Sequence, residues 1–318
     1  MTDGAGRWGA TTVAVTGGAG FLGSHLAERF AQEGARVVVL DNFSAADPNG
    51  VEALRRAGVE TRHVDILEPC SLREALDDAD VVLHLAALSN PRVCRDQIER
   101  GFDVNVVGVK NVIEASPAAR RLVFLSSAAV YGNPQRIPMA EDHPTNGTEP
   151  YALGKLMGEL VCQMYMQAGR AITVVRNFNT FGPRQAPGFL IPTIITQALE
   201  KGAVEIWNGD PVRDFLYVED FVDAIVRLVQ TPEAVGQTVN VGSGARTRVG
   251  DLARQISELL EVPFTDKRIP VNGSRELVCD NHRLRTLTGW QPRVNIQEGL
   301  RRTIEHYRTV LDSVAVAG

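Results

Sequence analysis

Cysteine is scarce in this chain, and its spacing is as informative as its number. The 318 residues contain four cysteines, Cys70, Cys94, Cys162 and Cys279, and no two of them form a C-x-x-C pair. A zinc site needs closely spaced ligands, and a disulfide framework is typical of small secreted domains. The sequence therefore argues against both, so no metal is expected and the cysteines are predicted to be reduced, packed thiols.

An excess of positive charge and a long apolar run are also missing. The net charge is -5 at pH 7, and no apolar run approaches the ~18 residues that a membrane span needs. Neither nucleic acid nor a membrane is therefore expected as a partner. Residues 1–12 lack the charged start and apolar centre of a secretory signal. We interpret them as a mobile tail and expect the protein in the cytoplasm.

Short apolar runs rich in β-branched residues alternate with helical stretches through the first half of the chain. Such continuous apolar runs are typical of strands that are covered on both faces. The alternation predicts a Rossmann-like α/β fold with a doubly wound parallel sheet and right-handed crossovers. The expected strands cover residues 11–15, 36–40, 59–64, 80–86, 121–127 and 171–177, and a helix is expected from about Tyr151 to Ala168.

Amphipathic segments replace this alternation after residue 177. Their periodicity predicts a smaller C-terminal α/β lobe. Residues 11–177 are assigned to a first domain, and residues 178–312 mainly to this lobe. An alternative is that some strands of residues 178–312 join the main sheet. Helices are expected near residues 189–202, 218–230 and 249–261, and short strands near residues 204–207, 213–218 and 237–242.

A glycine-rich loop follows the first expected strand and opens a helix. It carries Gly17, Gly18, Gly20 and Gly23. Glycines in this place let the backbone approach a pyrophosphate, and the helix N-terminus supplies oriented N-H groups. The second strand ends in Asp41, whose carboxylate suits the ribose hydroxyls of NAD and would repel the 2′-phosphate of NADP. The first domain is therefore predicted to bind NAD.

Two further strand ends face the same crevice in such a fold. Asp65 and Ile66 follow the third strand, and "LHLAAL" follows the fourth. Loops at the carboxyl ends of parallel strands line the ligand crevice. A buried strand end remains the alternative interpretation of the fourth-strand stretch.

Tyr151 and Lys155 are four residues apart on one expected helix, so their side chains share a face. An ammonium group and the positive nicotinamide ring would favour the phenolate of Tyr151, which could then act as a base. Ser127 ends the fifth strand and can hydrogen-bond the same substrate hydroxyl. The alternatives are a surface helix pair and a strand-end cap, which the upstream dinucleotide loop disfavours.

Seven ordered motifs together resemble the extended short-chain dehydrogenase/reductase family, in particular its NAD-dependent nucleotide-sugar epimerases and dehydratases. The resemblance covers about residues 12–307. The motifs are "TGGAGFLG", "DNFS", "HLAA", "SSAAVYG", "YALGK", "RNFNTFGPR" and "RDFLYVED".

This resemblance implies roles for individual residues. Ser127, Tyr151 and Lys155 would form the catalytic triad, and the last two would also contact NAD. "NGSRELVCD" and "WNGDPVRDF" are shorter than the family pattern, so the nucleotide pocket is expected to depart from the familiar layout. The cofactor would contact Gly17, Gly20, Phe21, Leu22, Gly23, Asp41, Asn42, Phe43, Ser44, Asp65, Ile66, Leu85, Ala86, Ala87, Asn105 and Phe178. The substrate would contact Ser89, Ser127, Asn179, Arg213 and Arg275.

The resemblance also narrows the reaction. Dehydratases of the family carry an Asp-Glu pair after the catalytic Ser or Thr, where this chain has Ala128 and Ala129. Members that act on uronates place an arginine where this chain has Ala186. We therefore expect a nucleotide-sugar 4-epimerase for a neutral hexose, with UDP as the preferred nucleotide, working as a homodimer. The helix that holds Tyr151 and Lys155 and a long helical stretch expected from about Cys94 to Ala115 resemble the pair that the family packs between subunits. An NDP-4-ketosugar reductase, a dehydratase and a non-catalytic NAD-sensing protein remain as alternatives.

Overall fold

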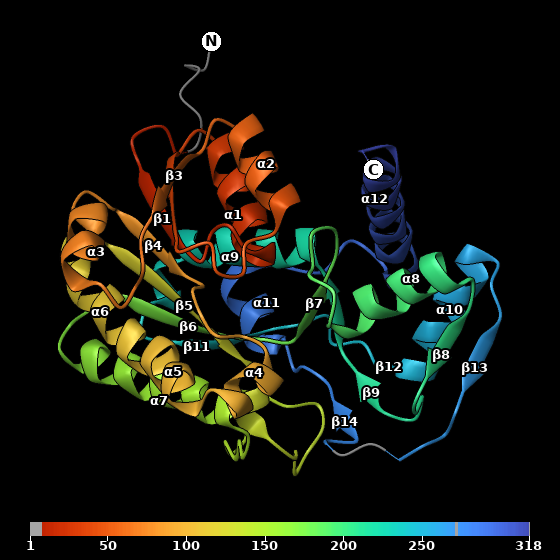
Figure 1. The fold of residues 1–318 in the computed structure, drawn as a ribbon. Helices are drawn as coiled ribbons and strands as arrows, with labels where there is room; N and C mark the ends of the chain where they lie inside the picture. Colours follow the sequence, from red (N-terminus) through yellow and green to blue (C-terminus); the bar gives the residue numbers. More distant parts are fainter. Residues whose placement is uncertain (1–7, 271–272, 318) are drawn as a thin grey trace.

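A seven-stranded parallel sheet forms the centre of the protein (Figure 1). The structure is a computed structural model and describes residues 8–270 and 273–317. The strand order is β11-β6-β5-β4-β1-β2-β3, and every neighbouring pair is parallel. The predicted doubly wound α/β fold is confirmed. The strands are β1 (Thr12–Thr16), β2 (Arg36–Asp41), β3 (Glu60–His63), β4 (Val81–His84), β5 (Arg121–Ser127), β6 (Ile172–Asn177) and β11 (Thr238–Val241).

Helices cover both faces of this sheet, which explains why its central strands are apolar on both sides. Pairwise packing groups them into two layers. The first layer holds α1 (Phe21–Gln32), α2 (Pro48–Arg56), α9 (Val218–Gln230) and α11 (His282–Thr288). The second holds α3 (Pro69–Leu76), α4 (Pro91–Asp96), α5 (Ile98–Phe102), α6 (Gly108–Ala115) and α7 (Pro150–Gln167).

The chain reverses its direction of travel across the sheet between β1 and β4. Strands β2 and β3 extend the sheet on one side of β1, and β4, β5, β6 and β11 extend it on the other. The chain therefore continues from β1 into α1 in the first helix layer and from β4 into α4 in the second. Ligands bind at such a switch point in open α/β sheets.

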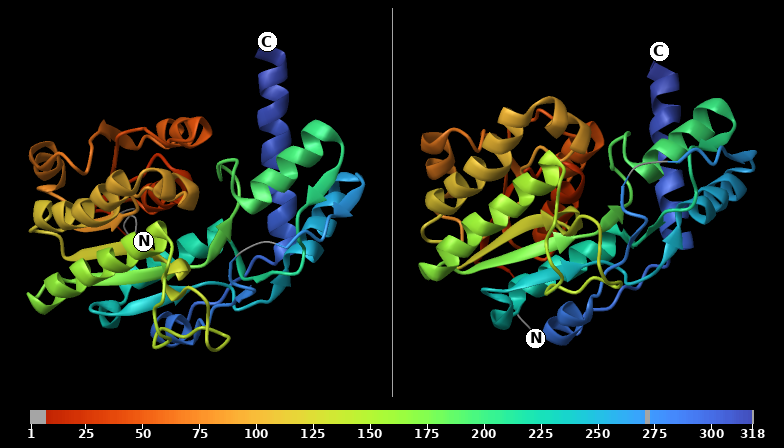
Figure 2. Two further views of the ribbon diagram at one scale, coloured as in Figure 1. Left: turned by 60° about the horizontal axis from the view of Figure 1, so that its bottom comes forward. Right: turned by 90° about the horizontal axis from the view of Figure 1, so that it is seen from below.

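The C-terminal lobe stands beside the carboxyl ends of the strands (Figure 2). It contains α8 (Leu190–Lys201), α10 (Val249–Leu260) and α12 (Ile296–Ala317). Three small sheets pair β10 with β7, β13 with β8, and β12 with β9 and β14. Their strands are β7 (Asn179–Phe181), β8 (Val204–Ile206), β9 (Val212–Arg213), β10 (Phe215–Tyr217), β12 (Thr247–Arg248), β13 (Phe264–Asp266) and β14 (Glu276–Leu277).

Two expected elements are broken in the structure. The strand expected at residues 213–218 divides into β9 and β10, because the side chain of Asp214 turns inward between them. The helical stretch expected from Cys94 to Ala115 divides into α4, α5, a π-helical turn at Asp103–Val107 and α6. Such π-turns are often found at functional sites.

The interpretation of residues 1–12 as a mobile tail is partly wrong. Residues 1–7 lie outside the described residues. From Trp8 onward the chain is packed: the indole lies edge-on against Phe30 with ring centroids 5.1 Å apart, and its Nε1 donates to Glu33 at 2.8 Å. The apolar indole anchors the segment that leads into β1.

The cysteines are free in the structure, as the sequence predicts, but they are not all packed. Cys94, Cys162 and Cys279 are buried, whereas Cys70 is exposed near the start of α3. Among the residues that the structure describes, no cluster of three or more metal-ligating side chains is found. Over the same residues, no helix is long and apolar enough to cross a membrane.

Candidate active site

The glycine loop after β1 packs directly against the loop after β4. Gly17 has φ +69°, and a Cβ there would lie 2.6 Å from the backbone N of Ala86. A Cβ at Gly23 would lie 2.4 Å from the carbonyl oxygen of Gly17. These two positions need glycine because backbone already fills the space.

Gly20 is glycine for a different reason. Its φ of -81° suits any residue, and a Cβ there would meet only the Gly17 oxygen, at 3.4 Å. Gly20 is the N-cap of α1, and no side chain caps the first N-H groups of that helix. A side chain at this position would crowd the helix N-terminus, where a phosphate binds. The loop therefore fits the pyrophosphate of a dinucleotide.

Asp41 fixes the shape of the predicted ribose site. Its Oδ2 accepts a hydrogen bond from the backbone N of Ala19 at 2.9 Å, and its Oδ1 accepts one from Phe43 at 2.8 Å. Each carboxylate oxygen keeps a second lone pair for a ribose hydroxyl. Phe43 is 37% exposed, and its ring stacks on that of His63 with centroids 6.0 Å apart. His63, which the sequence did not single out, thus supports an exposed aromatic face.

The loops after β2 and β3 are joined through side chains. Asn42 Nδ2 donates to Asp65 at 2.9 Å, and Asn42 Oδ1 accepts from the backbone N and hydroxyl of Ser44. Ile66 is buried and lies against Gly108 of α6. These predicted cofactor residues therefore form one connected wall, in which Ile66 contributes packing.

The loop after β4 is held by Asn105, which lies in the π-helical turn. Asn105 Oδ1 accepts from the backbone N of Leu88 at 2.9 Å, and its Nδ2 donates to the Leu88 oxygen at 3.1 Å. Asn105 is only 2% exposed. Both ends of its side chain therefore hold the loop, on which Leu85, Ala86 and Ala87 are partly exposed and Ser89 is exposed.

The structure brings Ser127 and Tyr151 together. Ser127 is the last residue of β5, and its side chain lies close enough to that of Tyr151, on the first turn of α7, to influence the pKa of the phenol. Burial raises the pKa of Tyr151, and the nearby Ser127 hydroxyl only partly offsets this effect. The described residues alone therefore do not lower the pKa of this phenol, and the expected phenolate depends on the positive charge of the Lys155 ammonium and of the nicotinamide ring.

Lys155 lies one turn after Tyr151 and is 3% exposed. Its Nζ donates to the backbone oxygen of Leu125 at 2.7 Å and lies 5.1 Å from the centroid of the Phe124 ring. Burial lowers the pKa of Lys155 to about 8, and the negative charge of the nearby Glu159 partly opposes that effect. Lys155 is therefore anchored to β5, the strand that carries Ser127.

Small apolar groups follow Ser127. Ala128 is buried, and the backbone N of Ala129 donates to Ser127 Oγ at 3.2 Å. Phe178, which the resemblance assigns to the cofactor, is 4% exposed and packs in a core with Ala128 and Tyr131. The two residues after the serine offer no side chain for proton transfer.

The predicted substrate residues of the C-terminal lobe gather around β9. Arg213 Nη1 donates to the backbone oxygen of Val212 at 2.8 Å. Among the described residues, no carboxylate forms an ion pair with this guanidinium. Burial lowers the pKa of Arg213. Arg275 directly precedes β14, which pairs with β9, so both arginines belong to one small sheet. Asn179 is exposed and donates to the oxygen of Asp214 at 3.0 Å.

Asp214 is a structural residue of this region that the sequence did not single out. It is fully buried. Its carboxylate accepts from the backbone N and hydroxyl of Ser243, and from the backbone N of Gly244 and Cys279, at 2.6–3.1 Å. It thus joins the segment that contains Arg213 to the segments that contain Ser243 and Cys279. The only sequence signal for it is that a carboxylate directly precedes the apolar run "FLYV".

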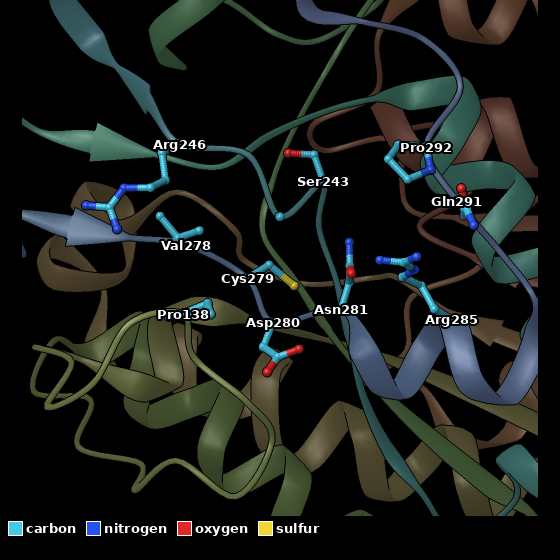
Figure 3. Close-up of a pocket in the computed structure, with 11 residues that line it drawn as sticks. Pro138, Ser243, Arg246, Val278, Cys279, Asp280, Asn281, Arg285, Gln291 and Pro292 are labelled. Atoms are coloured by element: carbon cyan, nitrogen blue, oxygen red, sulfur yellow. The ribbon is translucent and has the colours of Figure 1, made fainter.

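A separate polar cavity of about 490 Å³ lies where the loop after β11 meets α11 (Figure 3). Ser243, Asn281 and Arg285 are among the residues that line it. None of the predicted site residues contributes to its wall. It is therefore not the site that the sequence predicts.

Comparisons with known proteins agree with this geometry. The model of the NAD dependent epimerase/dehydratase family matches residues 13–242. UDP-glucose 4-epimerase of Mycolicibacterium smegmatis is 34% identical over 307 residues, which are 92% of this chain and 97% of that protein. UDP-glucuronic acid decarboxylase 1 of Xenopus tropicalis is 31% identical over 318 residues, covering 95% of this chain and 73% of that protein. The solved structure of UDP-glucuronic acid 4-epimerase from Bacillus cereus with UDP-glucuronic acid and NAD has a TM-score of 0.87 at 25% identity, covering 94% of this chain and all of that one.

Proposed function

The chain belongs to the NAD-dependent epimerase/dehydratase family, and we propose that it is a nucleotide-sugar 4-epimerase acting on a neutral NDP-hexose, with UDP as the expected nucleotide. The observation that carries this proposal is the contact between Ser127 and Tyr151 in a site where Ala128 and Ala129 follow the serine. The site can move one proton at a hydroxyl, and it offers no further acid or base on the segment after Ser127.

NAD is the cofactor of this family, and when bound it supplies a hydride acceptor that can return the hydride. The residues present fit it. Gly20 leaves the N-terminus of α1 open for the pyrophosphate, Asp41 presents its carboxylate for the adenosine ribose, and Phe43 presents an aromatic face. We assign residues 11–177 to cofactor binding and residues 178–312 mainly to substrate binding.

Three side chains of the chain share the proton transfer. Ser127 orients the 4-hydroxyl of the sugar and the Tyr151 phenol by hydrogen bonds. Tyr151 Oη accepts the hydroxyl proton as the 4-keto sugar forms and returns it when the hydroxyl is restored. Because burial raises the pKa of Tyr151, its phenolate depends on positive charge nearby, and the Lys155 ammonium is placed one turn away on the same helix face.

Other reactions of the family need groups that this site lacks. Loss of water from C5 and C6 needs an acid and a base beside the serine, where Ala128 and Ala129 stand. A uronate needs a cation that faces its carboxylate. Arg184, the cation of the "GPRQAP" loop, is instead paired with Glu28 of α1 at 2.5 Å and hydrogen-bonded to His25 at 2.6 Å. A neutral hexose is therefore favoured over a uronate.

The diphosphate of the substrate is assigned to the small sheet of the C-terminal lobe. Arg213 has a partly buried guanidinium that no carboxylate neutralises among the described residues, and Arg275 directly precedes the neighbouring strand β14. A guanidinium binds phosphate oxygens through paired N-H groups. Asn179 and Ser89 are exposed and complete the proposed substrate contacts.

A homodimer is part of this proposal. Helices α5 and α7 pack together and carry large exposed apolar side chains. Leu153, Leu160 and Met164 repeat along one face of α7 and are 40%, 53% and 68% exposed. Ile98 and Phe102 of α5 extend this surface. A contiguous apolar surface on two packed helices suits a second copy of the same chain.

The direct test is incubation of the purified protein with a panel of NDP-sugars and analysis of the products by NMR. An epimerase inverts C4 of a neutral NDP-hexose without net oxidation. A reductase, the second candidate, uses the same triad once per turnover and consumes reduced cofactor in proportion to product. Release of water or of carbon dioxide would identify a dehydratase or a decarboxylase and would reject the proposal.

A further inference from the structure

A buried polar cluster with one ion pair lies on β5, α7 and β6, next in sequence to the catalytic side chains of β5 and α7. It consists of Ser126, Glu159 and Arg176, which are 2%, 8% and 7% exposed. Arg176 Nη2 donates to Glu159 Oε2 at 2.7 Å, and Arg176 Nε donates to Glu159 Oε1 at 3.0 Å. The Ser126 hydroxyl donates to the same Oε1 at 2.5 Å. One carboxylate therefore joins three different elements: β5, α7 and β6.

The position of Glu159 in the sequence connects the cluster with the active site. It lies four residues after Lys155 and eight after Tyr151, so the three side chains follow one face of α7. Ser126 directly precedes Ser127 on β5. The bond between Ser126 and Glu159 therefore ties the strand that carries Ser127 to the helix that carries Tyr151 and Lys155.

The remaining bonds of Arg176 explain why Glu159 stays in place. Arg176 Nη1 donates to the hydroxyl of Tyr131 at 3.1 Å, and its guanidinium lies 4.8 Å from the centroid of the Tyr131 ring. The Tyr131 hydroxyl donates to Asn240 of β11 at 2.7 Å. Buried polar groups that are all bonded in this way hold one geometry, because any other arrangement leaves a group unpaired.

We propose that Glu159 is a positioning residue, whose carboxylate holds β5 and α7 in register so that Ser127, Tyr151 and Lys155 meet in the geometry the reaction needs. This inference rests on the proposed function. It adds a role for a residue that does not touch the substrate. A misplacement of about 1 Å costs on the order of 10²-fold in rate, so such a residue is expected to affect turnover more than substrate binding.

The carboxylate also acts on Lys155 through charge. The titratable or charged groups around Lys155 include the two thiols of Cys94 and Cys162, whose pKa is raised by burial, and His84, whose pKa is lowered to about 3 by burial. All three are uncharged at neutral pH. Tyr151 is a phenol in the chain alone, and Arg176 lies behind Glu159. The Glu159 carboxylate therefore supplies the negative charge that supports the Lys155 ammonium.

Lysine is rare in this chain, which allows a direct test by NMR. The sequence contains four lysines, Lys110, Lys155, Lys201 and Lys267. Protein labelled with [ε-¹³C]lysine gives one signal from each, and Lys155→Arg identifies that of Lys155. We expect the midpoint of the Lys155 signal to lie at lower pH in Glu159→Gln than in the wild-type protein. Glu159→Asp keeps the charge and should restore a midpoint close to wild type.

A matched control separates this effect from general destabilisation. Asp220 on α9 is also a buried carboxylate, and it accepts hydrogen bonds from the backbone of Arg293 and Val294 at 2.9 Å. Asp220→Asn should lower the melting temperature and leave the Lys155 midpoint unchanged. An unchanged Lys155 midpoint in Glu159→Gln would overturn the electrostatic part of the proposal.

Ser126→Ala tests the geometric part, because it removes one hydroxyl and leaves the ion pair intact. We expect kcat with the NDP-hexose to fall roughly 10- to 100-fold, with KM and NAD affinity nearly unchanged. A purely structural role would lower the melting temperature and leave kcat at the wild-type value, which would overturn the proposal. If the wild-type protein epimerises no NDP-hexose, the proposed function fails, whereas the Lys155 titration still decides on Glu159.

Discussion

Tyr151 is the side chain whose loss has the most specific consequence. Phenylalanine keeps its ring and its packing on α7 but removes the oxygen that accepts the hydroxyl proton. General acid-base catalysis contributes on the order of 10² to 10⁴ in rate, so we expect turnover of Tyr151→Phe to fall by that factor. Single-turnover kinetics and a parallel measurement of NAD affinity would check this. Near-normal turnover with intact NAD binding would remove Tyr151 from the mechanism.

Asp41 is expected to decide between NAD and NADP. Its carboxylate holds the glycine loop through Ala19 and leaves lone pairs for the ribose hydroxyls, which a 2′-phosphate would face with like charge. Asp41→Asn keeps an acceptor and removes the charge. We expect it to weaken NAD binding by about 1.5–3 kcal/mol, or roughly 10- to 100-fold in Kd, and to reduce the discrimination against NADP. Calorimetric titration with both dinucleotides measures this, and equal affinities in the wild-type protein would contradict it.

Single residues also show where inference from sequence stops. Ser127, Tyr151 and Lys155 could be predicted because their types and order suit proton transfer beside a nicotinamide. Glu159 and Asp214 could not, because their roles depend on partners 33 and 29 residues away, Ser126 and Ser243. The raised pKa of Tyr151 was missed for the same reason, since burial is a property of the folded chain.

The apolar face of α7 makes the dimer testable. Leu160 lies at the middle of this face and is 53% exposed. We expect Leu160→Glu to yield a monomer at micromolar concentration, because a charge would be buried in the proposed interface at a cost of several kcal/mol. Light scattering measures the mass, with Thr286→Glu on the exposed part of α11 as the control. A wild-type monomer, or a Leu160→Glu dimer, would contradict this assignment of the surface.

Helices and strands were predictable where a single periodicity extends over a whole element. The strands of the main sheet and the helix α7 lie within a few residues of their expected bounds. The helical stretch from Cys94 to Ala115 is interrupted at Gln97, whose backbone is not helical, and it widens into a π-helical turn at Asn105, whose side chain bonds to the backbone of Leu88. No local pattern encodes this contact with another loop.

The proposed reaction, taken with the loops that would hold NAD, predicts that the cofactor stays bound through many turnovers. The glycine loop contacts both Asp41 and the loop after β4, so the proposed NAD contacts lie together. An epimerase regenerates NAD within each cycle. We expect the purified protein to carry NAD(H), and substrate to increase the absorbance of reduced nicotinamide. Protein that is isolated free of nucleotide and prefers NADPH would contradict both this expectation and the assignment of Asp41.

The type of reaction follows from the side chains that the whole site offers, so substitutions beside Ser127 are expected to change it. Ala128→Asp combined with Ala129→Glu places a carboxylate pair where dehydratases of the family carry one. We expect this double variant to epimerise more slowly and to release water slowly from an NDP-hexose, which mass spectrometry would detect as a loss of 18 Da. An unchanged rate of epimerisation would show that these positions lie outside the reacting geometry.

Product analysis of the wild-type protein tests the central proposal most directly. The purified protein is incubated with a neutral UDP-hexose, without added cofactor, and the anomeric and C4 protons are followed by NMR, with Tyr151→Phe as the control. The proposed function predicts that either C4 epimer gives the same equilibrium mixture, with no net loss of water or carbon dioxide. Loss of either molecule, or turnover only with stoichiometric reduced cofactor, would contradict it.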